Sequence, residues 1–512
     1  MFVRKKTRPS GTVCVQVIDK SSGRSKVVHT VGHSDSPTEI ARLVSAGHAW
    51  IARHGGQSVL DFNSGDPPDF FETVSESIES LELVGPDLIF GQLFDEVGFS
   101  RLEEPLFREL VISRLAYPGS KLKTVDYLSR YRGQLMEVSR LYRYLDKLHA
   151  GQMEQLQQIS FEHTRELFGG EISLMFYDVT TLYFEASEED DLRRMGFSKE
   201  GKHRHPQILL GLLVSPMGYP LSWELFHGKK YEGETLLPVL GKFVRRFGIE
   251  NVIVVADSGL LSRSNMELME DAGYEYILGA RLKNESGEIK EKILDLDLAE
   301  GQGAWLKRSD GRKLLVTYSE KRASKDAFNR NRGLQKLEKA VKGGKLGKQH
   351  INNRGYNKYL KMEGSLSVSI DYGKFERDAK WDGLKGYITN TELDEEKILA
   401  NYAHLWQIER AFRISKTDLR VRPIYHRVQR RIEAHICISF CAYKIYRELE
   451  RQLSEKGAGI SVEQAILILK SIFAINVGNP ETGEVRKIAL VKREDQKTLL
   501  KTFGIDWRNL RP

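Results

Sequence analysis

The stretch that most limits the fold of this chain is EISLMFYDVTTLYFEA, residues 171–186, in which β-branched and aromatic residues follow one another closely. Residues of this kind favour a β-strand, and so apolar a run predicts a strand in the interior of a sheet. Asp178 lies in the middle of the run. Burying a carboxylate is unfavourable unless a cation meets it, so we expect a metal ion or a basic partner at Asp178.

The segments that follow predict a sheet around this strand. Residues 205–228, HPQILLGLLVSPMGYPLSWELFHG, predict two more strands joined by a turn, and residues 234–248 predict an amphipathic helix that ends at Gly248. The run NVIVVADSGLLS predicts a buried strand that ends at Asp257, and a second helix and the strand YEYILGA follow it. The predicted order is three strands followed by a helix, a strand, a helix and a strand. This order is typical of a mixed α/β sheet.

Two carboxylates on neighbouring strands can form a metal site. If the strands of Asp178 and Asp257 lie side by side, a third acid from a helix would complete a set of hard oxygen ligands suited to Mg²⁺. Two such ions about 4 Å apart can activate the attacking oxygen and stabilise the leaving oxygen in phosphodiester chemistry. The alternative for Asp257 is a cap or turn residue, since aspartate is common where a strand ends.

The candidate third acid is Glu409, in the middle of the basic, aromatic-bearing stretch NYAHLWQIERAFRISKTD, residues 401–418. On one continuous helix, Tyr402, Glu409 and Lys416 fall seven residues apart and therefore share a face. Glu409 would complete the metal site, while Arg413 and Lys416 would hold the phosphates on which the ions act. The alternative is an ordinary surface helix with solvated side chains.

Basic residues are concentrated in two segments of the chain. There are thirteen bases against two acids from Lys321 to Lys361, and eight against one from Arg410 to Arg431. Together these segments could line one groove for a phosphate backbone, although each could equally be a solvated surface. Residues 106–131 have helical spacing broken at Pro-Gly-Ser, which predicts either a DNA-binding helix-turn-helix or a helical core.

Cysteine usage and hydropathy limit where the protein works. Its three cysteines are too few for a disulfide framework, and no two of them have the spacing of a structural zinc site. The basic N-terminus is not followed by the apolar segment of an export signal, and no apolar run approaches the length of a membrane span. We therefore expect a cytoplasmic protein.

The order YDVTT, VVADSG and YxxLWQIERAFRxxKxDLxVRPIYH resembles the DDE transposases of bacterial insertion sequences. The branch that it resembles has a Tyr-x2-Arg-x3-Glu-x6-Lys signature and a β-rich insertion between the second and third acids. The resemblance spans roughly residues 171–445 and implies an α/β fold with a ribonuclease-H-like catalytic domain. It also implies that Asp178, Asp257 and Glu409 are the catalytic acids, which bind two Mg²⁺ ions, with Mn²⁺ as a substitute.

The signature fits this chain at every position but one. Tyr402 and Lys416 match its Tyr and Lys, whereas Leu405 stands where family members have an arginine that contacts DNA phosphates at the transposon end. A leucine cannot bind a phosphate, so that contact must come from elsewhere. The basic residues expected at the DNA instead are Arg410 and Arg413, with Arg420 further along the chain.

The insertion, residues 286–380, is expected to be β-rich around the first basic segment, and DGLKGYITN, residues 382–390, resembles the strand that returns to the catalytic sheet. Family members stack an insertion-domain tryptophan on a flipped base. Trp305 and Trp381 are the candidates for that role, with Trp305 preferred. Trp406 is expected in the core because Ile408 lies beside it, and Trp381 has the same alternative.

The other segments complete the predicted domain order. They are an N-terminal β-hairpin segment (1–36), an α-rich region that could bind DNA (37–165), the first part of the catalytic core (171–285), its second part with the third acid (381–450) and a helical C-terminal region (451–512).

The predicted function is that of a DNA transposase that acts as a homodimer bridging two transposon ends. It would bind the terminal inverted repeats of its element, cleave the DNA strands there and join the freed 3′-hydroxyls to target DNA. One alternative is a catalytically silent DNA-binding regulator, against which the presence of all three acids argues. The other is a ribonuclease-H-like nuclease, which would have no use for the basic insertion.

Overall fold

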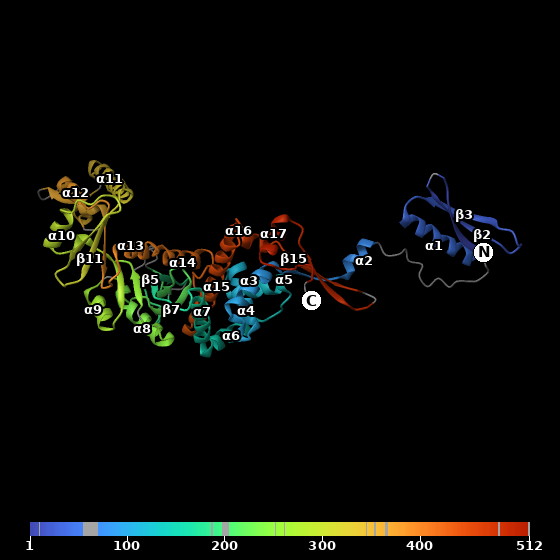
Figure 1. Cartoon of the computed structure of the whole chain (residues 1–512), viewed down its shortest axis with the longest axis horizontal. Helices are drawn as coiled ribbons and strands as arrows, with labels where there is room; N and C mark the ends of the chain where they lie inside the picture. The colour runs from blue at the N-terminus through green and yellow to red at the C-terminus, as the bar shows by residue number, and fades with distance from the viewer. Residues whose placement is uncertain are drawn as a thin grey trace. The chain divides into compact units, whose positions relative to one another are not determined.

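The computed structural model contains two compact units, Met1–Ser77 and Ile78–Pro512, each of which is described by itself (Figure 1). The structure describes residues 1–9, 11–54, 70–185, 188–196, 204–250, 252–260, 262–344, 346–352, 355–363, 367–479 and 482–509. No helix in these ranges is long and apolar enough to cross a membrane.

The first unit is a three-stranded antiparallel sheet with one helix on it. Its strands β1 (Phe2–Thr7), β2 (Val13–Asp19) and β3 (Lys26–Ser34) lie in that order, and α1 (Pro37–His54) packs against all three. A short helix, α2 (Phe70–Ser77), ends the unit. The predicted hairpin is present as β2 and β3, but β1 extends it to a sheet. Because α1 covers this sheet, the unit continues beyond the boundary expected at residue 36.

Five strands at the centre of the second unit carry the catalytic pattern. They are β5 (Leu174–Tyr183), β6 (Gln207–Val214), β7 (Pro220–His227), β8 (Ile253–Ala256) and β9 (Glu275–Ala280). The spatial order is β9-β8-β5-β6-β7. Strand β6 is antiparallel to both of its neighbours, β5 and β7, whereas β5, β8 and β9 are parallel. This arrangement is the mixed sheet that the residues predict and the ribonuclease-H-like sheet that the resemblance implies.

Three further strands extend the sheet beyond β9. The predicted return strand is β14 (Leu384–Thr389), which pairs antiparallel with β9, and β11 (Lys313–Tyr318) and β10 (Gly303–Lys307) follow it outward. The strands β10 and β11, expected in a separate insertion, are therefore part of the main sheet. The alternating residues Leu314 and Val316 of β11 are fully buried in the core that underlies the catalytic strands.

The rest of the insertion is more helical than the β-rich domain implied by the resemblance. It contains α10 (Gly287–Leu294), α11 (Glu320–Lys342), the hairpin β12 (Leu360–Glu363) and β13 (Ser367–Ile370), and α12 (Tyr372–Ala379). The long basic helix α11 forms because Leu334, Leu337 and Val341 recur at helical spacing and build a small core with the hairpin.

Two hydrophobic cores cover the two faces of the central sheet. On one face lie α8 (Leu236–Phe247) and α9 (Arg263–Asp271), and on the other lie α13 (Glu395–Ala403), α14 (Trp406–Thr417) and the long α15 (Gln429–Glu455) (Figure 1). The helix predicted at 234–248 is thus α8, and Gly248 ends it in a left-handed conformation, φ 60°. Gly adopts that conformation without steric strain.

Helices from both ends of the unit pack around α15. From the N-terminal side come α3 (Gly85–Val97), α4 (Pro105–Ala116), α6 (Val138–Gly151) and α7 (Met153–Leu167), whereas α5 (Lys121–Arg132) packs against α4 and α6. The predicted break at Pro-Gly-Ser falls between α4 and α5. Short 3-10 helices lie at Phe99–Leu102, Glu232–Glu234, Leu282–Asn284, Lys348–His350 and Gly355–Tyr359.

The C-terminal region, predicted as helical, also contains strands. It has α16 (Val462–Leu469) and α17 (Glu494–Thr502), and between them the strands β15 (Phe473–Gly478) and β16 (Val485–Leu490). Both belong to a small sheet with β4 (Ile78–Leu83), at the start of the unit. A strand whose partner lies so far away in the chain has only a weak local signal.

Candidate active site

Asp178 and Asp257 occupy corresponding positions on neighbouring parallel strands. The last paired residues of β5 and β8 are Tyr177 and Ala256, and each aspartate is the next residue along its strand. Adjacent strands lie about 4.8 Å apart, so the two carboxylates start from neighbouring backbone positions. The prediction that Asp178 lies inside the first strand and Asp257 at the end of the fourth is confirmed.

Both aspartates face the side of the sheet that α13 and α14 cover. Tyr177 and Val179 belong to the core on the side of α8, so by strand alternation Asp178 between them points to the opposite side. Ala256 belongs to the same core, and Asp257 continues the alternation. Asp178 is half-buried and Asp257 is exposed, with its Oδ1 accepting a hydrogen bond from the Gly259 backbone N–H.

Glu409 lies on α14, which packs against β5 and β6 on this same side. Its side chain is exposed, whereas Ile408, Ala411 and Phe412 of the helix are buried in the core. Glu409 is therefore on the outer part of a helix whose inner part is fixed to the strand of Asp178.

The single helix expected from Tyr402 to Lys416 is interrupted. Helix α13 ends at Ala403 and α14 begins at Trp406, so the seven-residue spacing does not place Tyr402 on the face of Glu409. The break arises where Leu405 turns inward: it is 9% exposed and packs in the core, whereas the next residue, Trp406, is 49% exposed. The expectation that Trp406 is a core residue is thus wrong.

Tyr402 is nevertheless affected by the charges of two of the predicted catalytic acids. It is buried at the end of α13, and burial together with the charges of Asp257 and Glu409 raises the pKa of its hydroxyl well above the usual range. The ring of Tyr387 packs edge-on against it, with centroids 4.8 Å apart. The hydroxyl therefore stays protonated and can act as a hydrogen-bond donor.

Lys385 of β14 is a neighbour of the site that the sequence analysis did not identify. Its Nζ lies 4.3 Å from the ring centroid of Tyr402. Burial and the nearby Arg322 lower the pKa of Lys385 to about 8, against the opposing effect of Glu409. The available signal was the charge itself, since Lys385 interrupts an otherwise apolar strand.

The donor set of the site consists of carboxylate oxygens, which suit Mg²⁺ and Mn²⁺. Across the described parts of the chain, no three His, Cys, Asp or Glu side chains converge closely enough to hold a metal ion. Asp178 and Asp257 are adjacent by strand register, and Glu409 shares their side of the sheet. The residue types and their common face therefore fit the predicted ions, while convergence of all three acids stays a prediction.

The basic residues predicted to bind DNA differ in their availability. Arg410 makes a bidentate ion pair with Glu450 of α15. Arg413 is exposed, and no described residue pairs with it. Lys416 is half-buried near the end of α14. Arg420 is exposed, in the segment after α14, and has a left-handed backbone with φ 47°.

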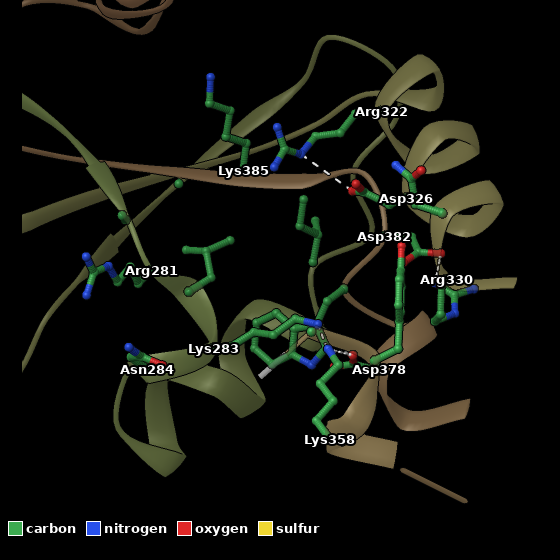
Figure 2. A pocket seen from close by; sticks show the side chains of 18 of the residues that line it. Arg281, Lys283, Asn284, Arg322, Asp326, Arg330, Lys358, Asp378, Asp382 and Lys385 are labelled. Carbon is green, nitrogen blue, oxygen red and sulfur yellow. Dashed lines mark hydrogen bonds and ion pairs between the residues drawn. The ribbon is translucent and has the colours of Figure 1, made fainter. Parts of the chain in front are cut away.

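A pocket of about 650 Å³ lies beside Lys385, between β14, α11 and the segment after β9. Six basic and three acidic side chains line it (Figure 2). The acids are paired: Asp378 binds Lys283 and Lys358, Asp382 binds Arg330, and Asp326 binds Arg322. Arg281 and Lys385 have no such partner among the described residues, so the pocket is positively charged.

The two candidate tryptophans of the insertion lie in different places. Trp381 is half-buried and lines this pocket, with the Nζ of Lys283 6.0 Å from its ring centroid. Trp305 is exposed on β10, the strand at the edge of the sheet.

Comparisons with known proteins agree with this arrangement. A family model described as "Transposase DDE domain" matches residues 169–445. A comparison with curated proteins found no match.

Three solved structures are similar to the chain. A piggyBac transposase synaptic complex with hairpin DNA is 10% identical, with a TM-score of 0.37, over 76% of this chain and 79% of that one. A Mos1 transposase paired-end complex with left transposon end is 12% identical, with a TM-score of 0.16, over 46% of this chain and 66% of that one. A Mos1 mariner paired-end complex with Mn is also 12% identical, with a TM-score of 0.15, over 46% and 67%.

The matched region makes up more than half of the chain. It contains the five central strands, both aspartates and the helix of Glu409. This chain therefore belongs to the family of transposases with a DDE domain.

Proposed function

We propose that this chain is the transposase of a bacterial insertion sequence, which cuts DNA at the ends of its element and joins those ends to a target. The observation that carries the proposal is the pairing of β5 with β8, which sets Asp178 and Asp257 at corresponding positions. Glu409 on α14 lies on the same side of the sheet, and membership of the DDE family supports a shared role for the three acids.

Asp178, Asp257 and Glu409 would together hold two Mg²⁺ or Mn²⁺ ions. Three carboxylates repel one another, so a cation favours their approach, and Asp257 and Glu409 are exposed enough to move toward it. When bound, the ions would activate the attacking oxygen and stabilise the leaving oxygen of the phosphodiester.

Tyr402 would orient the acids. Its buried hydroxyl stays protonated, so it can donate a hydrogen bond to a carboxylate oxygen of Asp257 or Glu409 but cannot bind a cation as a phenolate. Lys385, with its ammonium above the same ring, would bind a DNA phosphate next to Glu409 and balance the negative charge of the site.

The basic pocket would receive the DNA strand that leads to the acids. Lys385 connects the pocket to Tyr402, and Trp381 offers an aromatic surface inside it. We therefore propose Trp381, in place of Trp305, as the residue that stacks on a flipped base. Exposed Arg413 and Arg420, together with Lys416, would contact phosphates outside the pocket. The active form would be a cytoplasmic homodimer that bridges two ends.

The test is cleavage of the element's own ends. Full-length protein is incubated with a duplex that carries the inverted repeats flanking its gene and with a scrambled duplex, each with Mg²⁺, Mn²⁺ or EDTA. We expect nicks at the repeat boundary that leave 3′-hydroxyls, only with a divalent metal and only on the repeat duplex. Binding without any cleavage would favour a regulator instead, and equal cleavage of both duplexes would favour a general nuclease.

A further inference from the structure

Four basic side chains are buried together away from the catalytic acids. They are Arg114 at the end of α4, Lys121 at the start of α5, His426 in the segment after α14, and His435 in α15. Their exposed fractions are only 3–9%. We call these four residues the cation cluster.

Hydrogen bonds in the cation cluster determine the tautomer of His435. His435 Nε2 lies 3.0 Å from the backbone oxygen of Val421, so this nitrogen carries the proton and donates it. His435 Nδ1 is then an acceptor, and Arg114 Nη2 donates to it at 3.4 Å. Burial and the nearby cations lower the pKa of His435 well below its usual value and the pKa of His426 to about 3. Both imidazoles are neutral at physiological pH.

Arg114 and Lys121 are left as buried cationic groups without an acid. Arg114 donates to the backbone oxygen of Leu419 at 3.4 Å, and no carboxylate affects its pKa, which burial lowers to about 10. Lys121 makes no hydrogen bond or ion pair with any described residue, and burial and Arg114 lower its pKa well below the usual value. A buried cation without a counter-charge is strongly unfavourable.

No carboxylate contributes to the pKa of Arg114 or Lys121, and two acids of the adjoining helices have other partners. Asp146 of α6 accepts hydrogen bonds from Arg430 and Arg431. Glu433, two residues before His435, pairs with His149. The counter-charge must therefore come from outside the described chain, or the Lys121 ammonium must lose its proton.

The surroundings of the cation cluster favour an incoming anion. The first turn of α5, a helix of twelve residues, begins at Lys121. The Ser120 hydroxyl accepts from the Lys123 backbone N–H there, and no described residue accepts from the N–H groups of Lys121 and Leu122.

Arg420 is exposed, and it lies between Leu419 and Val421, whose carbonyl oxygens accept hydrogen bonds from the cluster. Lys470 lies near Arg420 and has its Nζ 4.7 Å from the ring centroid of Tyr117. An exposed and a half-buried basic group thus lie near the cation cluster.

We propose that the cation cluster is a phosphate-binding site, in which Lys121 and Arg114 hold one phosphate group and the two neutral histidines shape its walls. The phosphate is assigned to a DNA backbone on the strength of the proposed function, and free phosphate shares the same chemistry. A phosphodiester bound here would tie the α4–α5 connection to the segment that follows α14, the helix of Glu409.

The first measurement is thermal melting of the full-length protein in potassium phosphate and in potassium chloride at equal ionic strength. Phosphate raises the melting temperature of folded proteins in general, because it is excluded from their surface. The contribution of the site is therefore only that part of the rise which Lys121→Met removes. The matched control is Lys123→Met, an exposed lysine in the same helix turn. We expect the wild type and Lys123→Met to melt several degrees higher in phosphate, and Lys121→Met to rise clearly less. An equal rise in all three proteins overturns the proposal.

Lys121→Met itself should fold, because it replaces a buried ammonium with an apolar chain of similar length. In chloride its melting temperature should equal or exceed that of the wild type, and a large drop would show that Lys121 has a structural partner and overturn the site.

The second measurement distinguishes the source of the phosphate. The logarithm of DNA affinity is followed against the logarithm of salt concentration, and Lys121→Met should reduce the slope by about one, as the loss of one phosphate contact does. If Lys121→Met leaves the slope unchanged but still shows the smaller rise of melting temperature in phosphate, the site binds free phosphate. That result overturns only the DNA assignment. Neither readout needs DNA cleavage, so failure of the proposed transposase activity would leave both results intact.

Discussion

The hydroxyl of Tyr402 lies so close to Gly279 that a Cβ atom on the glycine would be 2.4 Å from the oxygen. Gly279 is in β9, the neighbour of the strand that ends at Asp257. The same Cβ would be 3.2 Å from the backbone nitrogen of Ser258, the residue after that aspartate. Gly279 thus leaves the space through which the tyrosine reaches the catalytic edge of the sheet.

Gly279→Ala should therefore displace Tyr402 and lower both stability and cleavage. Overpacking of this kind destabilises a fold by roughly 1–3 kcal/mol. Tyr402→Phe in the same chain removes the clashing oxygen, so urea unfolding of the two single variants and the double variant should give a clearly non-additive result. Gly241→Ala is the control, because its Cβ in α8 would meet no atom within 4 Å. Additive losses would mean that the two residues do not meet in solution.

The three acids should be needed for cleavage but not for binding. Asp178→Asn, Asp257→Asn and Glu409→Gln each remove a ligand charge with almost no change of shape. Loss of a residue that merely supports a metal ligand lowers activity roughly 10–100-fold, so loss of a ligand itself should exceed that. DNA affinity, measured by fluorescence anisotropy, should stay equal or increase, since a negative charge near the phosphates is gone. A variant that still cleaves would exclude its residue from the metal site.

Arg410 and Arg413 should separate into a structural and a DNA-binding residue. Arg413→Ala should lower the salt slope of end binding by about one and leave the melting temperature unchanged, because the side chain is exposed. Arg410→Ala breaks a partly buried ion pair with Glu450, so its main effect should be a lower melting temperature. The reverse pattern would place Arg410 at the DNA.

Lys444 should make stability depend on pH. It is fully buried in α15, its Nζ donates to the backbone oxygen of Ser160 at 3.1 Å, and burial lowers its pKa from 10.5 to about 7. Between these two values the unfolded chain binds a proton that the folded chain does not, so the free energy of unfolding should rise as the pH rises from about 7 toward 10.5. Below about pH 7 both states are protonated and this dependence should vanish.

The measurement is urea unfolding of the wild type and Lys444→Met across this range of pH. Other groups titrate in both proteins, so the difference between the two curves isolates Lys444. A difference that stays constant from pH 7 to 10 would mean that the lysine keeps its proton when buried.

Local sequence patterns predicted the catalytic sheet because its strands are short, apolar and bounded by turns. The residue types within 171–186, and within the strand before Asp257, are enough to predict each strand. The register of the two strands then sets the two aspartates at corresponding positions. The return strand β14 was found through the resemblance of DGLKGYITN, residues 382–390, to the corresponding family strand. Such features need no knowledge of distant contacts.

Features that depend on distant contacts were missed or placed wrongly. The strand β15 pairs with β4, almost four hundred residues earlier, and β16 joins the sheet by pairing with β15. In the cation cluster, Arg114 contacts a carbonyl 305 residues further along the chain. The break between α13 and α14 carries no Gly or Pro, and Leu405 at the break is buried in the core. Helical periodicity alone therefore predicted one continuous helix.

Leu405 gives the sharpest test of that break, because the resemblance would put a DNA-binding arginine at this position. In the structure the side chain packs in the core beside α14, 9% exposed, while the adjacent Trp406 is 49% exposed. Leu405→Arg would bury an unpaired charge, which destabilises a fold by roughly 3–5 kcal/mol. Trp406→Arg is the matched control, and it should change the free energy of unfolding by less than about 1 kcal/mol because the new charge stays in water.

Thermal melting and end-DNA affinity, measured together on both variants, distinguish the two readings of position 405. We expect Leu405→Arg to melt far below the wild type without any gain in affinity, and Trp406→Arg to melt near it. If Leu405→Arg instead stayed folded and bound end DNA more tightly, the arginine would have reached a phosphate. The helix would then continue through residues 404 and 405 when DNA is bound, and the buried leucine would describe only the DNA-free protein.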